Sequence, residues 1–351
     1  MSKLGVGFFG DPDATEMARL AGLAEKAGFE SIWLAETRFT RDAITSATAV
    51  GQGTTTARVG TAAVNVFTRG AALTAVTFAG LDELTGGRAV LGIGAGSEHV
   101  LAAQGYRYDR PLARLREQVA AIRAVWRGED FEGEFVRITG VRLDFAPPRP
   151  EVPIYLAVSG PKSLAYAGEV ADGVILDVCT PVAHIEAAAR AVRAAATDAE
   201  REPSAVEIAG MVLVGVDGPE RTARSRLAPI VATYLTRFPT LAAVAGLPRD
   251  EIDDYVALAE TDGVAAVAAV LPDEVVDRLT VNGSPERCRE RIAEYRSSGL
   301  DLPILVAPLD QVGVVIDALG QGQAGQQRFR AAPDLTVVRQ QVRLVGIDGS
   351  R

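Results

Sequence analysis

Cysteine and histidine are both scarce in this chain of 351 residues. There are two of each, namely Cys179, Cys288, His99 and His184. The cysteines lie far apart, and neither has a second metal ligand at a short spacing, so the sequence excludes a disulfide framework and a zinc site. We expect two free thiols and no bound metal ion.

Long apolar runs and an excess of positive charge are also absent. Charged residues or glycine interrupt every apolar run before the ~20 residues that a membrane span needs, and residues 1–9 lack the pattern of a signal peptide. The formal net charge is −9, whereas binding to nucleic acid needs a basic face. With 48% hydrophobic residues, we expect a globular cytoplasmic protein that acts on a small molecule and binds neither nucleic acid nor membrane.

Strand-like and helix-like segments alternate along the chain, which is typical of parallel β/α units. Asp13 and Ser284 are expected N-caps of two of the helices. Eight strands are predicted, at residues 3–9, 31–35, 58–64, 89–93, 153–157, 172–177, 206–216 and 303–308. This count favours the α/β class, and within it a (β/α)8 TIM barrel over residues 1–325, with a helical insertion at about 219–280 between strands seven and eight. Residues 326–351 are expected to form a tail or an arm.

The stretch RAVLGIGAGSEH, residues 88–99, joins an apolar strand to a glycine-rich loop. A dinucleotide-binding loop would run directly into a long helix and be followed by an acidic residue ~20 residues later, and neither feature is present here. The favoured interpretation is a barrel strand whose carboxyl end opens into an active-site loop, because ligands bind at that face of a barrel. The alternative is that the glycines only allow close packing. The favoured interpretation brings five residues to one mouth: Gly94, Gly96, Ser97, Glu98 and His99.

Two further strand ends carry candidate ligand-binding residues. Ser159, Gly160, Pro161 and Lys162 follow the fifth strand and start a helix, where exposed backbone amides and one lysine suit a phosphate group. An ordinary helix start remains the alternative. Asp177 ends the sixth strand and is expected to face the same mouth.

Four stretches in this order resemble the luciferase-like superfamily: VGTAAVNVFTRGAALTA, DELTGGRAVLGIGAGSEH, RPLARLREQVAAIRAVWRGE and PIYLAVSGPKSLAYAGEVADGVILD. Within that superfamily they are most similar to the deazaflavin-dependent oxidoreductases, and in particular to the methylenetetrahydromethanopterin reductases. The resemblance is strong over residues 3–215 and weaker over 280–320.

The resemblance implies a TIM barrel that binds coenzyme F420, or FMN in other branches, at its mouth. It implies a non-prolyl cis peptide bond at Ala62–Ala63, against which the ring system leans. Asn65 would bind the polar edge of the ring, although it could instead close a turn, and Gly96 with Ser97 would add further donors. A homodimer is also implied.

The chain departs from its relatives at two positions. Related enzymes commonly carry an acid followed by histidine where this chain has Glu36 and Thr37, and the reductases tend to have glutamate where it has Gly7. Glu36 and Thr37 stay among the catalytic candidates, with Glu36 expected to bond the edge of the ring. Glu98 or His99 becomes the best candidate for the general acid. The expected reaction is hydride transfer between C5 of the deazaflavin and an imine, activated alkene or carbonyl. The alternatives are an FMN-dependent monooxygenase and a non-catalytic flavin-binding barrel.

Overall fold

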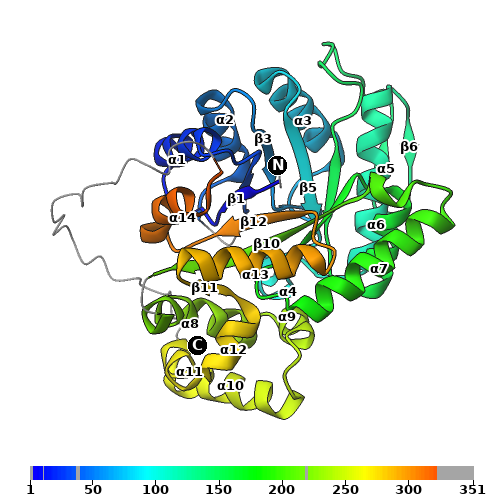
Figure 1. Cartoon of the computed structure of the whole chain (residues 1–351). Helices are drawn as coiled ribbons and strands as arrows, with labels where there is room; N and C mark the ends of the chain where they lie inside the picture. Colours follow the sequence, from blue (N-terminus) through cyan, green and yellow to red (C-terminus); the bar gives the residue numbers. More distant parts are fainter. Residues whose placement is uncertain (1–2, 11, 37–39, 218–219, 322–351) are drawn as a thin grey trace.

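Eight parallel strands form a closed barrel in the computed structural model, which describes residues 3–10, 12–36, 40–217 and 220–321 (Figure 1). Hydrogen bonds between β9 and β10 complete the ring, so the predicted TIM barrel is confirmed. Thr37 and the predicted tail at 326–351 lie outside the described residues. The barrel strands, in the order around the ring, are β1 (Gly5–Phe8), β2 (Ser31–Leu34), β3 (Arg58–Thr61), β5 (Ala89–Gly94), β8 (Ile154–Ala157), β9 (Gly173–Leu176), β10 (Glu207–Val216) and β12 (Leu302–Val306).

Helices surround the ring because each parallel connection needs a crossover. The Asp13 side chain accepts a hydrogen bond from the Glu16 amide at 2.9 Å, and Ser284 accepts one from Arg287 at 3.3 Å, so both predicted caps are confirmed. The surrounding helices are α1 (Ala14–Lys26), α2 (Ala43–Gly53), α3 (Ala71–Thr85), α5 (Pro111–Arg127), α6 (Pro161–Val170), α7 (Val182–Asp198), α13 (Pro285–Ser297) and α14 (Val312–Leu319). Shorter elements are β4 (Val64–Asn65), α4 (Glu98–Ala102), the hairpin β6 (Phe131–Glu132) and β7 (Arg137–Ile138), and the 3-10 turns η1 (Pro203–Ala205) and η2 (Leu309–Gln311).

A group of helices separates β10 from β12 and lies together at one end of the barrel (Figure 1). It comprises α8 (Glu220–Arg237), α9 (Pro239–Val244), α10 (Arg249–Asp262), α11 (Val264–Val270) and α12 (Asp273–Leu279). A short strand, β11 (Val281–Gly283), follows them and pairs with the end of β10. This strand was not expected, because three residues are too few to show a periodic pattern. Within the described ranges, no helix combines the length and the hydrophobicity that crossing a membrane requires.

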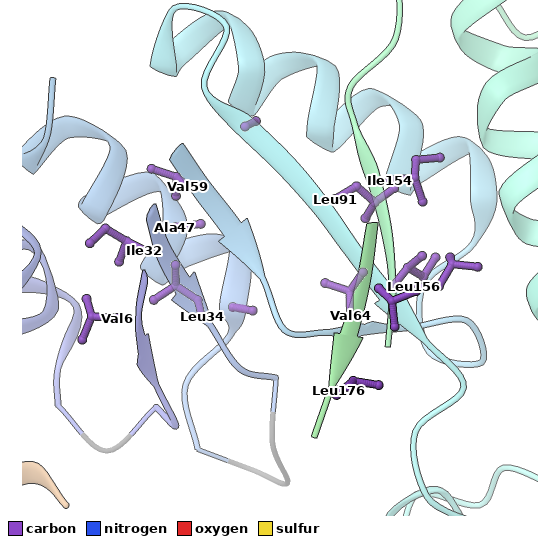
Figure 2. Packing of buried hydrophobic residues seen from close by; sticks show 14 of the residues in the cluster. Val6, Ile32, Leu34, Ala47, Val59, Val64, Leu91, Ile154, Leu156 and Leu176 are labelled. Atoms are coloured by element: carbon purple, nitrogen blue, oxygen red, sulfur yellow. The ribbon is translucent and has the colours of Figure 1, made fainter. Parts of the chain in front are cut away.

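Alternate residues of each strand point to opposite sides of the barrel wall. The outward side chains pack against the helices, and Figure 2 shows Ile32, Leu34 and Val59 around Ala47 of α2. The inward side chains form a second apolar cluster that fills the ring and continues to α8. Its inward members include Trp33, Val90, Tyr155, Ile175, Ala209, Met211, Leu213, Leu302, Ile304 and Val306.

The amino-terminal end of the barrel interior is closed by a charged cluster around Arg58. The guanidinium of Arg58 lies 3.0 Å from both the Tyr155 hydroxyl and a Glu207 carboxylate oxygen, and it also pairs with Glu30. Lys3 binds the other oxygen of Glu207 at 2.7 Å. Burial opposes ionisation of Arg58, but its neighbours, with Tyr155 and Glu207 first, raise its pKa above the ordinary value. Arg58 and Glu207 therefore stay ionised, while the raised pKa of Tyr155 keeps its hydroxyl protonated. The cluster blocks this end, which leaves the opposite end of the barrel for a ligand.

The close approach of β3 to β5 requires glycine at position 92. A Cβ atom on Gly92 would lie 1.7 Å from the backbone oxygen of Thr61, and the Thr61 hydroxyl bonds both the amide and the carbonyl of Gly92. The two strands therefore have no room for a side chain here.

We expect Gly92→Ala to lower the free energy of unfolding by about 3 kcal/mol, because backbone must move to relieve the clash. Thermal unfolding monitored by circular dichroism measures the change. Gly80→Ala is the matched control, since a Cβ at this position of α3 meets nothing within 4 Å and alanine favours helix by up to ~1 kcal/mol. An unchanged midpoint for Gly92→Ala would show that the strands can separate at little cost.

Candidate functional site

The predicted site residues follow the carboxyl ends of five barrel strands or lie in the short strand β4. Because the strands are parallel, these ends share one rim of the barrel, which we call the mouth. The mouth residues are Glu36 after β2, Ala62 and Ala63 after β3, Asn65 in β4, Gly96, Ser97 and Glu98 after β5, Ser159, Gly160, Pro161 and Lys162 after β8, and Asp177 after β9. The structure thus brings the candidates from separate stretches of sequence to one end of the molecule.

The Ala62–Ala63 peptide bond is cis, as predicted. It separates β3 from β4, and β4 then pairs with the carboxyl end of β5. Ala62 packs on the inward apolar cluster, and its small side chain leaves the mouth open next to β3.

Asn65 closes a turn. Its Oδ1 accepts a hydrogen bond from the Phe67 amide at 2.7 Å, and its Nδ2 donates to the Ala95 carbonyl at 3.2 Å. Gly96 has a φ of +67°, and a Cβ there would lie 2.0 Å from the Asn65 Nδ2 atom. The side chain therefore ties two rim loops together, and its contact with a cofactor ring stays a prediction.

The loop after β5 carries one polar atom that has no partner. Ser97 is the N-cap residue of α4, but its side chain makes no capping bond, and its buried Oγ has no hydrogen-bond partner within the described ranges. Glu98 and His99 are exposed in the first turn of α4. Tyr108 donates a hydrogen bond to the Gly96 carbonyl at 3.3 Å, and burial, with the nearby charge of Glu98, raises its pKa. The unpartnered hydroxyl of Ser97 can thus serve a ligand, and the acid role of Glu98 and His99 remains a prediction.

Glu36 forms an ion pair with Arg69 at 2.9 Å. Arg69 also contacts Asp42, and its carbonyl accepts a hydrogen bond from the Gln118 amide at 2.6 Å. The bond to Glu36 raises the pKa of Arg69. Sequence reasoning missed Arg69, because 33 positions separate it from Glu36 and no spacing rule connects them. At the β2 edge of the mouth the carboxylate is therefore neutralised by a fixed cation.

The loop from Ser159 to Lys162 starts α6, with Gly160 as the N-cap residue and Pro161 in the first turn. Lys162 is exposed and forms no ion pair within the described ranges. His184, in the first turn of α7, is hydrogen-bonded to the backbone of Ser159, and burial lowers its pKa. Its Nε2 atom is buried and has no hydrogen-bond partner among the described residues. The start of α6, with the exposed Lys162, thus shares this part of the rim with a histidine nitrogen that has no partner among the described residues, and these groups suit an anionic ligand.

Asp177 follows β9 and continues its inward-facing positions, after Gly173 and Ile175. Its Oδ1 accepts a hydrogen bond from the Val178 amide at 2.8 Å. Val178 and Cys179 are buried in the inward apolar cluster. Burial raises the pKa of Asp177 to about 6, so this carboxyl group changes its ionisation close to neutral pH.

A cavity of about 670 Å³ lies outside the barrel, between the start of α3, α5 and the hairpin β6–β7. Its walls include Phe67, Tyr106, Arg114 and Phe135. Arg114 stacks on both phenylalanine rings and pairs with Asp109, so its charge is already balanced. None of the residues predicted to be catalytic or to bind the cofactor lines this cavity, whereas Phe67 and Tyr106, which the sequence also offers as walls of a substrate pocket, do.

Comparisons with known proteins support an assignment of family. Residues 4–302 match the family model described as luciferase-like monooxygenase. A 5,10-methylenetetrahydromethanopterin reductase of Methanolobus tindarius is 31% identical over 313 residues, which cover 87% of this chain and 94% of the relative. An F420-dependent glucose-6-phosphate dehydrogenase of Mycolicibacterium smegmatis is 29% identical, over 84% of this chain and 88% of the relative.

Among solved structures, the coenzyme F420-dependent tetrahydromethanopterin reductase of Methanopyrus kandleri superposes with a TM-score of 0.83. The match covers 91% of this chain and 97% of that one, at 21% identity, and therefore supports the fold. The family model covers most of the chain, and the resemblance predicted from four stretches of sequence agrees with it. The chain belongs to the luciferase-like monooxygenase family.

Proposed function

We propose that the protein is an oxidoreductase that uses coenzyme F420 and transfers hydride between C5 of the deazaflavin and a small organic substrate. The substrate carbon would belong to an imine, an activated alkene or a carbonyl group. Relatives at 29% identity that are named as F420-dependent glucose-6-phosphate dehydrogenases and span 84% of this chain support the proposal.

The main support for the proposal is that small side chains and the loop from Ser159 to Lys162, which suits an anion, lie on the same rim of the barrel. Ala62, Gly94 and Ala157 line the mouth with small side chains where a flat ring system needs space. The loop from Ser159 to Lys162 would offer the phosphate of a cofactor side chain the start of α6 and a lysine that has no ion pair within the described residues. The buried Ser97 hydroxyl, which lacks a protein partner in the described ranges, fits a further polar contact with such a ligand.

In the reaction, the bound deazaflavin supplies the hydride chemistry. Lys162 and the start of α6 would hold the anionic side chain. Ala62 and Ala157 leave the ring room to approach the barrel wall, while the apolar side chains below them, such as Met211 and Ile304, exclude water. Glu36 stays paired with Arg69 and orients the loops at the β2 edge.

An FMN-dependent monooxygenase is the main alternative, because the family is named for monooxygenases. A non-catalytic flavin-binding barrel is the other, since Gly7 and Thr37 replace residues to which the resemblance assigns proton transfer. A homodimer and a cytoplasmic location also stay predictions, and sedimentation of the purified protein would check the first of them.

We expect the purified protein to bind F420 with a dissociation constant in the micromolar range or below, and to bind FMN at least ~10-fold more weakly. Quenching of deazaflavin and flavin fluorescence during titration measures both constants. Tight binding of FMN together with oxygen consumption by the reduced complex would instead favour the monooxygenase. Binding of F420 without reduction of any acceptor would favour the non-catalytic barrel.

We expect Lys162→Ala to weaken F420 binding about 10-fold or more, because it removes a charged contact to a phosphate. Lys26→Ala is the matched control: Lys26 is also exposed, but it lies in the last turn of α1. The same titration compares the two variants at low and at high salt, and only the Lys162 variant should lose its salt dependence. Equal affinities for both variants would place the phosphate elsewhere.

A further inference from the structure

Within the described residues, ionisable side chains point into the barrel only near its two ends, the amino-terminal end and the mouth. Arg58, Tyr155 and Glu207 bind one another at the amino-terminal end. At the level of the mouth, the inward positions are mostly small or apolar: Gly7, Ala35, Ala62, Gly94, Ala157, Met211, Leu213 and Val306. Asp177 is the ionisable side chain among them.

The position of Asp177 follows from the strand register. Ala157 of β8 and Ala209 of β10 both lie beside Ile175 of β9. Extended two residues past these pairs, beyond the ends of β8 and β9, the register aligns Asp177 with Ser159 and Met211. This alignment places Asp177 at the rim between the loop that starts α6 and the apolar wall formed by β10.

The wall opposite β3 includes β9, β10 and β12. A flat ligand that rests against Ala62 turns its other face toward this wall. A substrate bound between the ligand and the wall would then contact Asp177, Met211 and Val306. Gly7 cannot supply a proton there, and a side chain at that position would meet Val306, Ile304 and Met211.

The elements that flank Asp177 leave it without an ion pair in the described part of the chain. Cys179, on the same loop, is buried, and burial raises the pKa of its thiol. Burial lowers the pKa of His184, so both groups are neutral near pH 7. Lys162 is exposed at the start of α6. The Val178 amide occupies Oδ1 of Asp177, which leaves Oδ2 as the oxygen that carries a transferable proton.

We propose that Asp177 is a catalytic residue that exchanges a proton with the substrate heteroatom during hydride transfer. This inference rests on the proposed function. It assigns to Asp177 the acid role that sequence reasoning gave to Glu98 and His99, and it makes a C=N or C=O group the substrate class.

The reduced deazaflavin is the reductant in this step. The substrate carbon receives a hydride, which brings two electrons, while the π electron pair of the C=N or C=O bond moves to the heteroatom. The heteroatom takes the proton from Oδ2, and Asp177 is left as a carboxylate. The cofactor becomes oxidised and loses its own N–H proton to solvent, and water reprotonates Asp177. In the reverse direction the carboxylate accepts the proton from an amine or alcohol.

Asp177→Asn tests the proposal with two hydride acceptors in the reduced F420 complex. Cyclohexanone and a neutral cyclic imine take a proton on the heteroatom as they are reduced, whereas the N-benzylnicotinamide cation needs only the hydride. We expect Asp177→Asn to slow reduction of the proton-requiring acceptors about 100-fold or more. The rate of nicotinamide reduction and the dissociation constant of F420 should not change. Asp144→Asn, an exposed aspartate between β7 and β8, is the isosteric control and should change none of these.

A readout that needs no turnover is the infrared band of a protonated carboxyl group in the cofactor-free protein. The difference spectrum between the parent and Asp177→Asn should show this band at pH 5 and lose it with a midpoint near pH 6. The rate with proton-requiring acceptors should fall over the same range, because the acid form is lost as the pH rises.

Three results would overturn the proposal. The first is an Asp177 carboxyl group that stays ionised from pH 5 upward. The second is that the Asp177→Asn variant reduces the proton-requiring acceptors at the parent rate. Equal slowing with both kinds of acceptor would also contradict it, since that result means a structural or cofactor-binding role. Failure of the parent protein to bind F420 would instead contradict the proposed function.

Discussion

Closure of the parallel ring, completed by the pairing of β9 with β10, is the constraint on which the other features depend. Eight strands send alternate side chains into a narrow interior, so large residues there must face glycine. Trp33 lies against Gly60, and the ring of Tyr155 occupies the space next to Gly173. Polar groups are confined to the two ends, where one end is closed by mutual ion pairing around Arg58 and the other end receives ligand.

Much of this architecture could be predicted from the sequence. Periodic patterns located the barrel strands, and strand polarity alone placed Glu36, Ser97, Lys162 and Asp177 on one rim. The pairing of Arg69 with Glu36 could not be predicted, because it depends on how two loops 33 residues apart meet in space. The Arg58 cluster could not be predicted for the same reason, since Glu207 is 149 positions away from Arg58. The turn that Asn65 closes could be established only when its hydrogen-bond partners were known.

The position of Asp177 also explains why its chemistry differs from that of the other rim acids. Glu36 lies next to a cation and Glu98 is exposed, whereas Asp177 has no ion pair among the described residues and precedes the buried Val178 and Cys179. Its pKa in the folded protein is raised, so the folded state favours the protonated form. At low pH, where the group is protonated in both folded and unfolded chains, it has no effect on stability. Above pH 6 the folded protein holds a poorly solvated carboxylate, which costs roughly 3 kcal/mol. Such a cost is typical of residues kept for reactivity rather than for stability.

The apolar cluster inside the barrel does not end at the strands. It continues from Met211 and Leu213 to Leu227, Val231 and Leu235 of α8, and on to Val267 of α11 and Val275 of α12. Barrel and helices therefore bury each other's hydrophobic surface and cannot melt separately. Heating should therefore produce a single cooperative transition. A shortened chain without α8 to α12 would expose an apolar surface on β10 and would be prone to aggregate.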